Sequence, residues 1–274
     1  MIRTAFLAAF LAASLLPVGG TAQQTSALDE LDRRGDLLGW EAVGRLDSPG
    51  GFCTGTLIAS DLVLTAAHCV FDASGQRIAP ERMVFRAGYS NGRSIAERRA
   101  DRVAVPGSYH HSADGTQNAA DIGSDVALVR LSSPVSASEA APFRLHETPR
   151  AGDRVSVVSY GRGRSEALSR QAECNVTDRF RGGIMSFDCN VTYGSSGAPV
   201  FMRYGTRVRI VSLISGGTRL GESDVVSYGM ELPAIVDTLK QQLRAGGSRP
   251  AASDGARRIQ VGQRNATGAR FVRP

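Results

Sequence analysis

After its first 22 residues, this 274-residue sequence has no apolar run long enough to span a bilayer as a helix, and it has no internal repeat. These absences argue against a protein with helical membrane spans and against a repeat array. The only long apolar run lies near the start, where a single charge, Arg3, precedes the segment Ala5–Leu16. Small residues follow it up to Ala22, which is typical of a secretion signal. We expect residues 1–22 to be a signal peptide, and the protein to be secreted or periplasmic.

The chain also has little net charge outside its C-terminal end. The formal charge is +6, but residues 241–274 hold seven arginines and one acid, and Arg3 adds one more, so residues 23–240 carry a net charge of −1. This distribution argues against a nucleic-acid partner. Residues 245–274 are rich in Gly, Ala, Ser and Arg and lack an amphipathic period, which predicts a disordered basic tail that is free to contact an anionic surface.

Short β-branched runs separated by Gly, Pro, Ser and Asp fill residues 40–240, with no alternating helices. This pattern predicts an all-β barrel or sandwich architecture. A helix is expected after Pro233, and a join between two halves at 132–152. The expected strands include Glu41–Leu46, Gly55–Ala59, Leu62–Thr65, Arg82–Ala87, Val126–Leu131, Arg154–Tyr160, Ala198–Met202 and Val208–Ile214.

The four cysteines lack the short Cys-x-x-Cys spacing of a structural zinc site. They form two closely spaced couples, and an exported chain meets an oxidising compartment. We therefore expect disulfides between Cys53 and Cys69 and between Cys174 and Cys189. The alternatives are buried free thiols or a four-cysteine metal site.

Three stretches contain candidate catalytic residues. In "LVLTAAHCV" (62–70), His68 follows an apolar strand beside a cysteine, which suits a general base that must hold its position. In "DIGSDVALVRL" (121–131), Asp125 precedes an apolar strand and is a candidate partner for the imidazole, with Asp121 as its rival. In "TYGSSGAPV" (192–200), two adjacent serines are candidate nucleophiles. The alternatives are a core histidine, turn aspartates and a tight polar turn.

In the order His, Asp, Ser, the blocks "GTLIASDLVLTAAHC", "DVALVRL" and "GSSGAPV" resemble the signature blocks of the chymotrypsin-like (trypsin-fold) serine proteases, bacterial secreted branch. The resemblance covers about residues 38–244. The family pattern Gly-Asp-Ser-Gly-Gly-Pro aligns with Gly194–Pro199 and identifies Ser196 as the nucleophile, with His68 as base and Asp125 as acid. It also implies an oxyanion hole formed by the N–H groups of Gly194 and Ser196.

This resemblance implies two antiparallel six-stranded β-barrels with the site between them, followed by a C-terminal helix. The protease domain is expected at 39–244, after an N-terminal segment or short propeptide at 23–38. The implied substrate is a peptide or protein, and the implied mechanism needs no metal or organic cofactor. The expected substrate-binding residues are Asn190, Val191, Tyr193, Ile214, Ser215, Gly216 and Gly217.

The sequence departs from the family pattern at three places. "ISGG" (214–217) lacks the family's tryptophan, and Asn190 stands where the trypsin branch has an acid that binds basic side chains. Ser195 stands where many members have an aspartate that pairs with a new N-terminal ammonium. We expect little preference for basic residues at the cleaved position, and activity that does not need a free N-terminal amine. Two alternatives remain: a non-catalytic homologue that acts as a binding module, and a surface-binding protein that acts through its basic tail.

Overall fold

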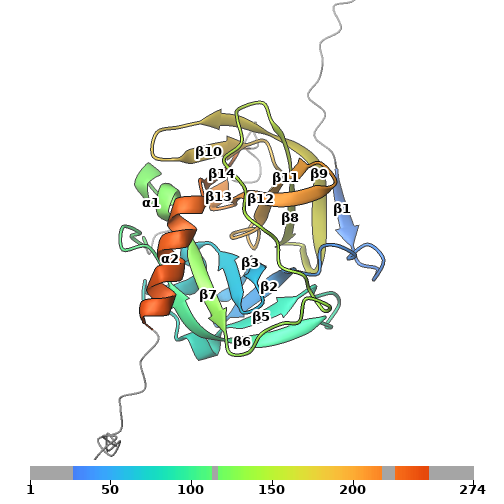
Figure 1. Cartoon of the computed structure of the whole chain (residues 1–274), viewed down its shortest axis with the longest axis vertical. Helices are drawn as coiled ribbons and strands as arrows, with labels where there is room; N and C mark the ends of the chain where they lie inside the picture. The colour runs from blue at the N-terminus through green and yellow to red at the C-terminus, as the bar shows by residue number, and fades with distance from the viewer. Residues whose placement is uncertain (1–26, 113–116, 218–225, 247–274) are drawn as a thin grey trace, which may run out of the picture.

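The computed structural model describes residues 27–112, 117–217 and 226–246 (Figure 1). The expected signal peptide and almost all of the expected basic tail lie outside the described residues. Within those three ranges the chain folds into two antiparallel β units and two α-helices. None of the helices in these ranges is long and apolar enough to cross a membrane.

The first unit is a closed barrel of six strands in the order β2-β3-β4-β7-β6-β5. Fully buried side chains such as Leu57, Val63 and Phe85 fill its interior. The strands are β2 (Val43–Ser48), β3 (Gly51–Ala59), β4 (Leu62–Thr65), β5 (Val84–Ala87), β6 (Ala96–Ala104) and β7 (Ala127–Leu131).

The second unit is an eight-stranded sheet in the order β12-β11-β8-β9-β10-β14-β13, with β1 paired to β9. Its strands are β1 (Leu28–Leu31), β8 (Arg154–Gly161), β9 (Arg164–Arg179), β10 (Ile184–Phe187), β11 (Pro199–Tyr204), β12 (Arg207–Leu213), β13 (Gly216–Gly217) and β14 (Ser227–Met230). The predicted all-β class, with two antiparallel units and a C-terminal helix, is confirmed. The second unit differs from the expected closed barrel because its ladder of paired strands ends at β12 and β13 without closing.

The N-terminal segment is part of the folded unit. Strand β1 pairs with β9 from Leu28 opposite Gln171 to Leu31 opposite Leu168. Leu31 and Leu37 are both buried in the core cluster that also contains Leu168. The hydrophobic core therefore includes residues on the N-terminal side of position 39.

Strand β6 was not among the expected runs, because its sequence "AERRADRVA" hides the period of two. Ala96, Ala100 and Ala104 are buried, whereas Arg98 and Arg102, at the alternate positions between them, are only partly buried. Arginine can lay its aliphatic stem along apolar surface while its charge stays in water. Ala96 and Ala100 pack in the barrel interior and Ala104 in the other core cluster, because the register shifts between Ala100 and Arg102, so the sequence of β6 shows no single apolar face.

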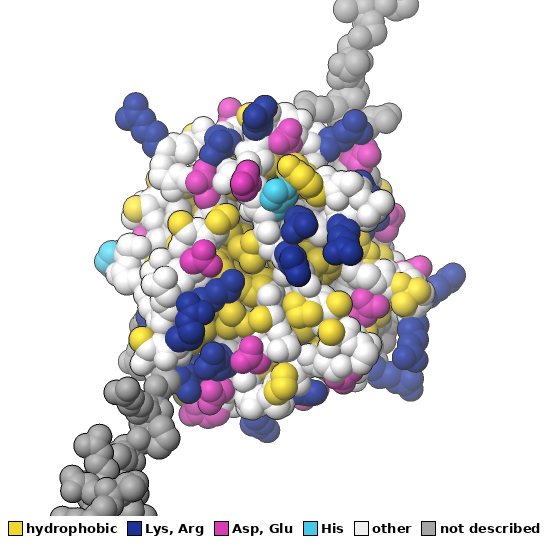
Figure 2. Space-filling model, viewed as in Figure 1, with side chains coloured by type: hydrophobic (Ala, Val, Ile, Leu, Met, Phe, Trp, Pro, Cys, Tyr) yellow, Lys and Arg dark blue, Asp and Glu magenta, His cyan; other side chains and the backbone are white. Residues whose placement is uncertain are grey.

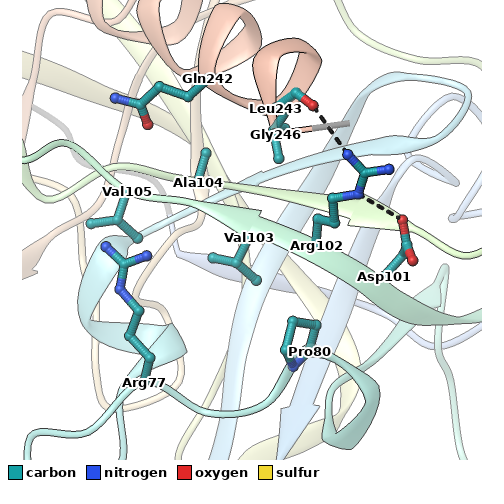
Figure 3. Close-up of a pocket in the computed structure, with 10 residues that line it drawn as sticks. All are labelled: Arg77, Pro80, Asp101, Arg102, Val103, Ala104, Val105, Gln242, Leu243 and Gly246. Carbon is teal, nitrogen blue, oxygen red and sulfur yellow. Dashed lines mark hydrogen bonds and ion pairs between the residues drawn. The ribbon is translucent and has the colours of Figure 1, made fainter. Parts of the chain in front are cut away.

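Helix α2 (Pro233–Ala245) follows the second sheet but packs against β6 and β7 of the first barrel (Figure 1). It buries Val236, Leu239 and Leu243. At its C-terminal end, Arg102 donates a hydrogen bond of 3.4 Å to the carbonyl of Leu243 and pairs with Asp101 at 3.4 Å (Figure 3). Such a contact satisfies one of the free carbonyls at a helix end. The cavity of about 330 Å³ in Figure 3 lies beside this contact and contains none of the candidate catalytic residues.

Both expected disulfides are present. Cys53 in β3 is bonded to Cys69 in the 3-10 turn η1 (Ala67–Val70), and Cys174 in β9 is bonded to Cys189 just after β10. Each bond closes a loop with a sequence separation of 16 or 15 residues. In the chain-entropy account, a loop of this size stabilises the fold by about 3 kcal/mol.

The surface of the described residues carries both signs of charge. Figure 2, in the orientation of Figure 1, shows basic side chains interspersed with acidic ones over this face. This agrees with the near-zero net charge of residues 23–240.

Candidate active site

His68 is held at the end of a rigid segment. Strand β4 is followed by the buried residues Ala66 and Ala67, and His68 lies in η1, next to the disulfide-bonded Cys69. Its backbone N–H donates to Oδ1 of Asp125 at 2.9 Å, and its Nδ1 lies 2.8 Å from Oδ2 of the same carboxylate. Because a carboxylate accepts hydrogen bonds, Nδ1 carries the proton and Nε2 is left as the basic nitrogen. The side chain of His68 is 25% exposed, so Nε2 belongs to a ring that solvent or a ligand can reach.

Asp125 lies between helix α1 (Ala119–Ser124) and β7, and its side chain is fully buried. The next residue, Val126, is fully buried just before β7, which fixes the backbone at this point. Besides His68, the carboxylate accepts hydrogen bonds at Oδ2 from the Ser215 hydroxyl, at 2.5 Å, and from Nε2 of Gln117, at 3.2 Å. The buried charge is therefore fully hydrogen-bonded, as such a charge must be.

The two titrating groups shift each other's pKa. Burial lowers the pKa of the His68 imidazole, but the charge of Asp125 and the hydrogen bond to it raise that pKa more, so the net shift is upward. Burial raises the pKa of Asp125, but the charge and hydrogen bond of His68 and the hydrogen bond from Ser215 lower it more, so the net shift is downward. The pair is therefore built to stabilise an imidazolium next to a carboxylate.

The turn at residues 192–197 brings Ser196 close to the segment that carries His68. Gly197 has a φ of +77°, and a Cβ at this position would clash with the Thr65 hydroxyl and the Thr54 carbonyl of the first barrel. The N–H of Thr54 donates to the Ser196 carbonyl at 2.9 Å, and its hydroxyl donates to the Gly194 carbonyl at 2.8 Å. Strand β3 thus fixes the serine turn, which lies against Thr65, three positions before His68.

Two observations concern the hydrogen bonds of the Ser196 hydroxyl and of the backbone N–H groups in this turn. Among the described residues, no hydrogen bond joins the Ser196 hydroxyl to the His68 ring; such contacts are often long when no substrate is bound. In the same ranges, the backbone N–H groups of Gly194 and Ser196 donate to no acceptor, whereas those of Ser195 and Gly197 do. Two N–H groups of one turn are therefore available to an oxygen atom from outside the chain.

The two adjacent serines have different surroundings. Ser195 is fully buried and its hydroxyl donates to the Tyr160 carbonyl at 3.0 Å. The same oxygen accepts hydrogen bonds from the Arg164 guanidinium at 3.1 Å and from the Thr192 N–H at 3.2 Å. Ser196 is half-buried. The Ser195 hydroxyl is therefore occupied by hydrogen bonds in the protein interior, and Ser196 is the serine that a substrate can approach.

Arg164 is a residue that the sequence analysis missed. Its guanidinium also donates to the carbonyl of Ser159 at 2.6 Å and to the Ser159 hydroxyl at 3.0 Å, and burial lowers the pKa of Arg164 to about 10. The sequence around it, "GRGR" at 161–164, is typical of a hairpin turn. Nothing in that pattern distinguishes an inward arginine from the exposed Arg162 beside it.

The expected substrate-binding residues do not all lie together. Ser215 contacts Asp125, and Gly216–Gly217 form β13, next to β14. A Cβ on Gly217 would lie 2.9 Å from Cγ2 of Val191, so these two segments are adjacent. Ile214 is 1% exposed and belongs to the core of the second sheet.

The remaining substrate-binding candidates lie at the surface, and the rival acid lies in a helix cap. Asn190 is exposed, and Tyr193 is 67% exposed with the Arg162 guanidinium 4.2 Å from its ring centre. Asp121, the rival acid, forms a capping box with Asn118 at the start of α1 and has no hydrogen bond to His68. The structure therefore brings Asp125, and not Asp121, to the imidazole.

Comparisons with known proteins agree with the architecture. The family model of a trypsin-like peptidase domain matches residues 53–208, more than half of the chain. The alpha- and beta-fibrinogenase OhS1 of Ophiophagus hannah is 34% identical over 117 residues, which span 42% of this chain and only 40% of that protein.

Three solved structures share the fold at low identity. They are a Glu endopeptidase in complex with MPD (TM-score 0.64, 16% identity, 80% of this chain and 97% of that chain), the thermostable serine protease AL20 from an extremophilic microorganism (0.60, 20%, 76% and 98%) and the protease Anisep from Arthrobacter nicotinovorans (0.60, 18%, 75% and 96%).

The contact between His68 and Asp125 predicts a fall in the pKa of His68 in Asp125→Asn, by more than about one unit, because the charge that raises it is removed while burial remains. NMR titration of the imidazole measures this, with the signal assigned from the spectrum of His68→Gln. The control is Asp121→Asn, which removes a nearby acid without a hydrogen bond to His68 and should leave that pKa close to its wild-type value. A larger fall in the control would make Asp121 the partner.

Proposed function

Because the chain belongs to the trypsin-like peptidase family, we propose that it is a serine endopeptidase that hydrolyses peptide bonds through Ser196, His68 and Asp125. The observation that carries this proposal is the pairing of His68 with a fully buried Asp125, at 2.8 Å, beside the turn that exposes Ser196. A buried, fully hydrogen-bonded carboxylate that fixes the tautomer of a partly exposed imidazole is the arrangement a general base requires.

In the proposed mechanism, Nε2 of His68 takes the proton of the Ser196 hydroxyl as its oxygen attacks the carbonyl carbon of the substrate. The N–H groups of Gly194 and Ser196 donate to the resulting oxyanion, and Asp125 stabilises the imidazolium. The imidazolium then gives its proton to the leaving amine, and an acyl-enzyme remains. A water molecule, deprotonated by His68, attacks the ester, and the carboxylic acid leaves with Ser196 restored. No step requires a metal or an organic cofactor.

The proposed organisation follows the same reasoning. Residues 1–22 act as a signal peptide, and the mature protein works in the periplasm or outside the cell. Two disulfides support an oxidising compartment. The pairing of β1 with β9 supports retention of the N-terminal segment in the mature enzyme rather than its removal as a propeptide. The protease domain then ends with α2 at Ala245, and the arginines of the basic sequence that follows can contact an anionic surface.

Replacement of Ser196 by Ala should lower kcat/KM on a peptide substrate by on the order of 10⁴-fold or more, because it removes the nucleophile. Labelling by a fluorophosphonate probe should be lost as well. The matched control is Ser195→Ala: it removes a buried hydroxyl with no route to the substrate and should retain probe labelling and most of the activity. Equal loss in both variants would contradict the assignment. A wild-type protein that neither reacts with the probe nor cleaves peptides would be a binding module instead.

The surroundings of position 190 predict weak cleavage after Lys, Arg or Glu. Asn190 is a neutral amide and offers no negative charge to pair with a Lys or Arg side chain, and Ile214 is a buried apolar side chain that offers no positive charge to a Glu side chain. Cleavage should favour neutral or apolar residues. Mass-spectrometric profiling of a peptide library measures this preference, with the Ser196→Ala protein as the blank. A profile in which most cleavages follow Arg, Lys or Glu would contradict it.

The contacts of Ser195 predict that activity does not depend on a free N-terminal amine. A new N-terminal ammonium has no carboxylate to pair with at Ser195, because that side chain is a hydroxyl that already binds the Arg164 guanidinium. Acetylated and free-amine forms that both start at Gln23 should have equal turnover per active site, as titrated with a covalent inhibitor. A loss of a hundredfold or more on acetylation alone would show that the amine is required.

A further inference from the structure

A side chain outside the proposed triad also binds its acid. Nε2 of Gln117, in the segment just before α1, donates to Oδ2 of Asp125 at 3.2 Å. The hydroxyl of Ser215 lies 3.4 Å from Oε1 of the same amide. One amide therefore lies between Asp125 of the first unit and Ser215 of the second.

Two constraints fix the position of this amide. The next residue, Asn118, is the N-cap of α1 and forms a capping box with Asp121, which holds the backbone. On the other side, a Cβ on Gly216 of β13 would lie 3.4 Å from Oε1 of Gln117, so the amide lies against the strand that carries two of the expected substrate-binding glycines. The side chain is thus enclosed between the buried acid and this strand.

The orientation of the amide follows from the chemistry of its neighbour. A carboxylate only accepts hydrogen bonds, so the NH₂ group must face Asp125. The reverse orientation would bring Oε1 against the carboxylate oxygen and leave that oxygen without a donor. Oε1 then lies on the side of Ser215, whose single hydroxyl proton goes to the closer oxygen of Asp125.

A count of donors gives Gln117 a defined share of the network. An ionised carboxylate offers about four acceptor positions. The backbone N–H of His68 binds Oδ1 at 2.9 Å, whereas Nδ1 of His68, the Ser215 hydroxyl and Nε2 of Gln117 share Oδ2 at 2.8, 2.5 and 3.2 Å. The hydrogen bond from Gln117 is the longest of the four. Gln117 therefore adjusts the position and charge of the carboxylate and does not fix it alone.

We propose that Gln117 is a positioning residue that acts through Asp125, whose Oδ2 it binds, and so sets the geometry and basicity of His68. The inference rests on the proposed function of His68 as general base. Without the NH₂ donor, the carboxylate keeps more of its negative charge for the imidazole, and the protonated form of His68 becomes more favourable. Reaction should then begin only at higher pH.

The test uses Gln117→Met, which keeps an unbranched side chain of similar length but removes the donor. NMR titration should show a rise in the pKa of His68 of about half a unit. In Gln117→Glu, an ionised side chain adds a second negative charge, and the rise should be larger, about one unit. The matched control is Gln76→Met, at an exposed loop position, which should titrate as the wild type does.

Other ionisable groups in this region stay the same in all variants. Tyr109 and Asp121 lie on the two sides of the Gln117 segment along the chain, and His110 and His111 line a pocket together with Gln117. A difference between the wild type and a variant at 117 therefore comes from position 117 itself. Near-UV circular dichroism and thermal melting of each variant establish that it is folded.

Activity gives the second readout. In Gln117→Met, kcat/KM should fall about tenfold and its acid limb should move to higher pH by the same amount as the His68 titration. A side chain that only fills space would leave both the acid limb and the titration unmoved. If folded Gln117→Met and Gln117→Glu both titrate as wild type, the proposal is overturned. The titration needs no turnover, so it judges Gln117 even if the wild type proves inactive, a result that would overturn only the proposed function.

Discussion

The site depends on one buried charge. The Asp125 carboxylate is fully excluded from water, and an ionised group in such surroundings is costly unless donors surround it. Its donors come from different parts of the chain: His68 belongs to the first barrel, and Ser215 follows the last long strand of the second sheet. Separation of the two units would leave the charge without part of its hydrogen-bond shell. Docking of the two units and completion of the hydrogen bonds to Asp125 are therefore energetically coupled.

A second set of hydrogen bonds also joins the two units, here from the first barrel to the serine turn of the second unit. The turn that carries Ser196 belongs to the second unit, yet Thr54 of the first barrel binds its carbonyls at 194 and 196. Below these contacts, Leu64 and Leu128 of the barrel share a buried cluster with Phe201 and Ile210 of the sheet. The distance between imidazole and serine is thus set by the packing of this shared core and not by local chain geometry.

The half-buried Arg164 is positioned by the first barrel as well. Arg45 of β2 donates to the Ser165 carbonyl at 3.0 Å and lies over the ring of Tyr89 at 3.9 Å, and the Tyr89 hydroxyl donates to Glu166 at 2.7 Å. These contacts hold the hairpin between β8 and β9, from which Arg164 reaches Ser195. The interior of the serine turn is therefore filled by a side chain of the chain itself, fixed by a cluster on the neighbouring unit.

The sequence alone determined the all-β class, the C-terminal helix, both disulfides and the blocks around His68, Asp125 and Ser196, because apolar periodicity, cysteine spacing and short motifs are local properties. It named Asp125, which precedes the apolar strand, but could not exclude Asp121, a carboxylate four residues earlier, by chemistry alone; only the fold gave one a capping box and the other the imidazole. Strand β6 and the inward Arg164 were missed because arginine looks polar wherever its stem packs. Gln117 and the open second sheet depend on contacts between segments apart in the chain, and such contacts exist only once the chain has folded.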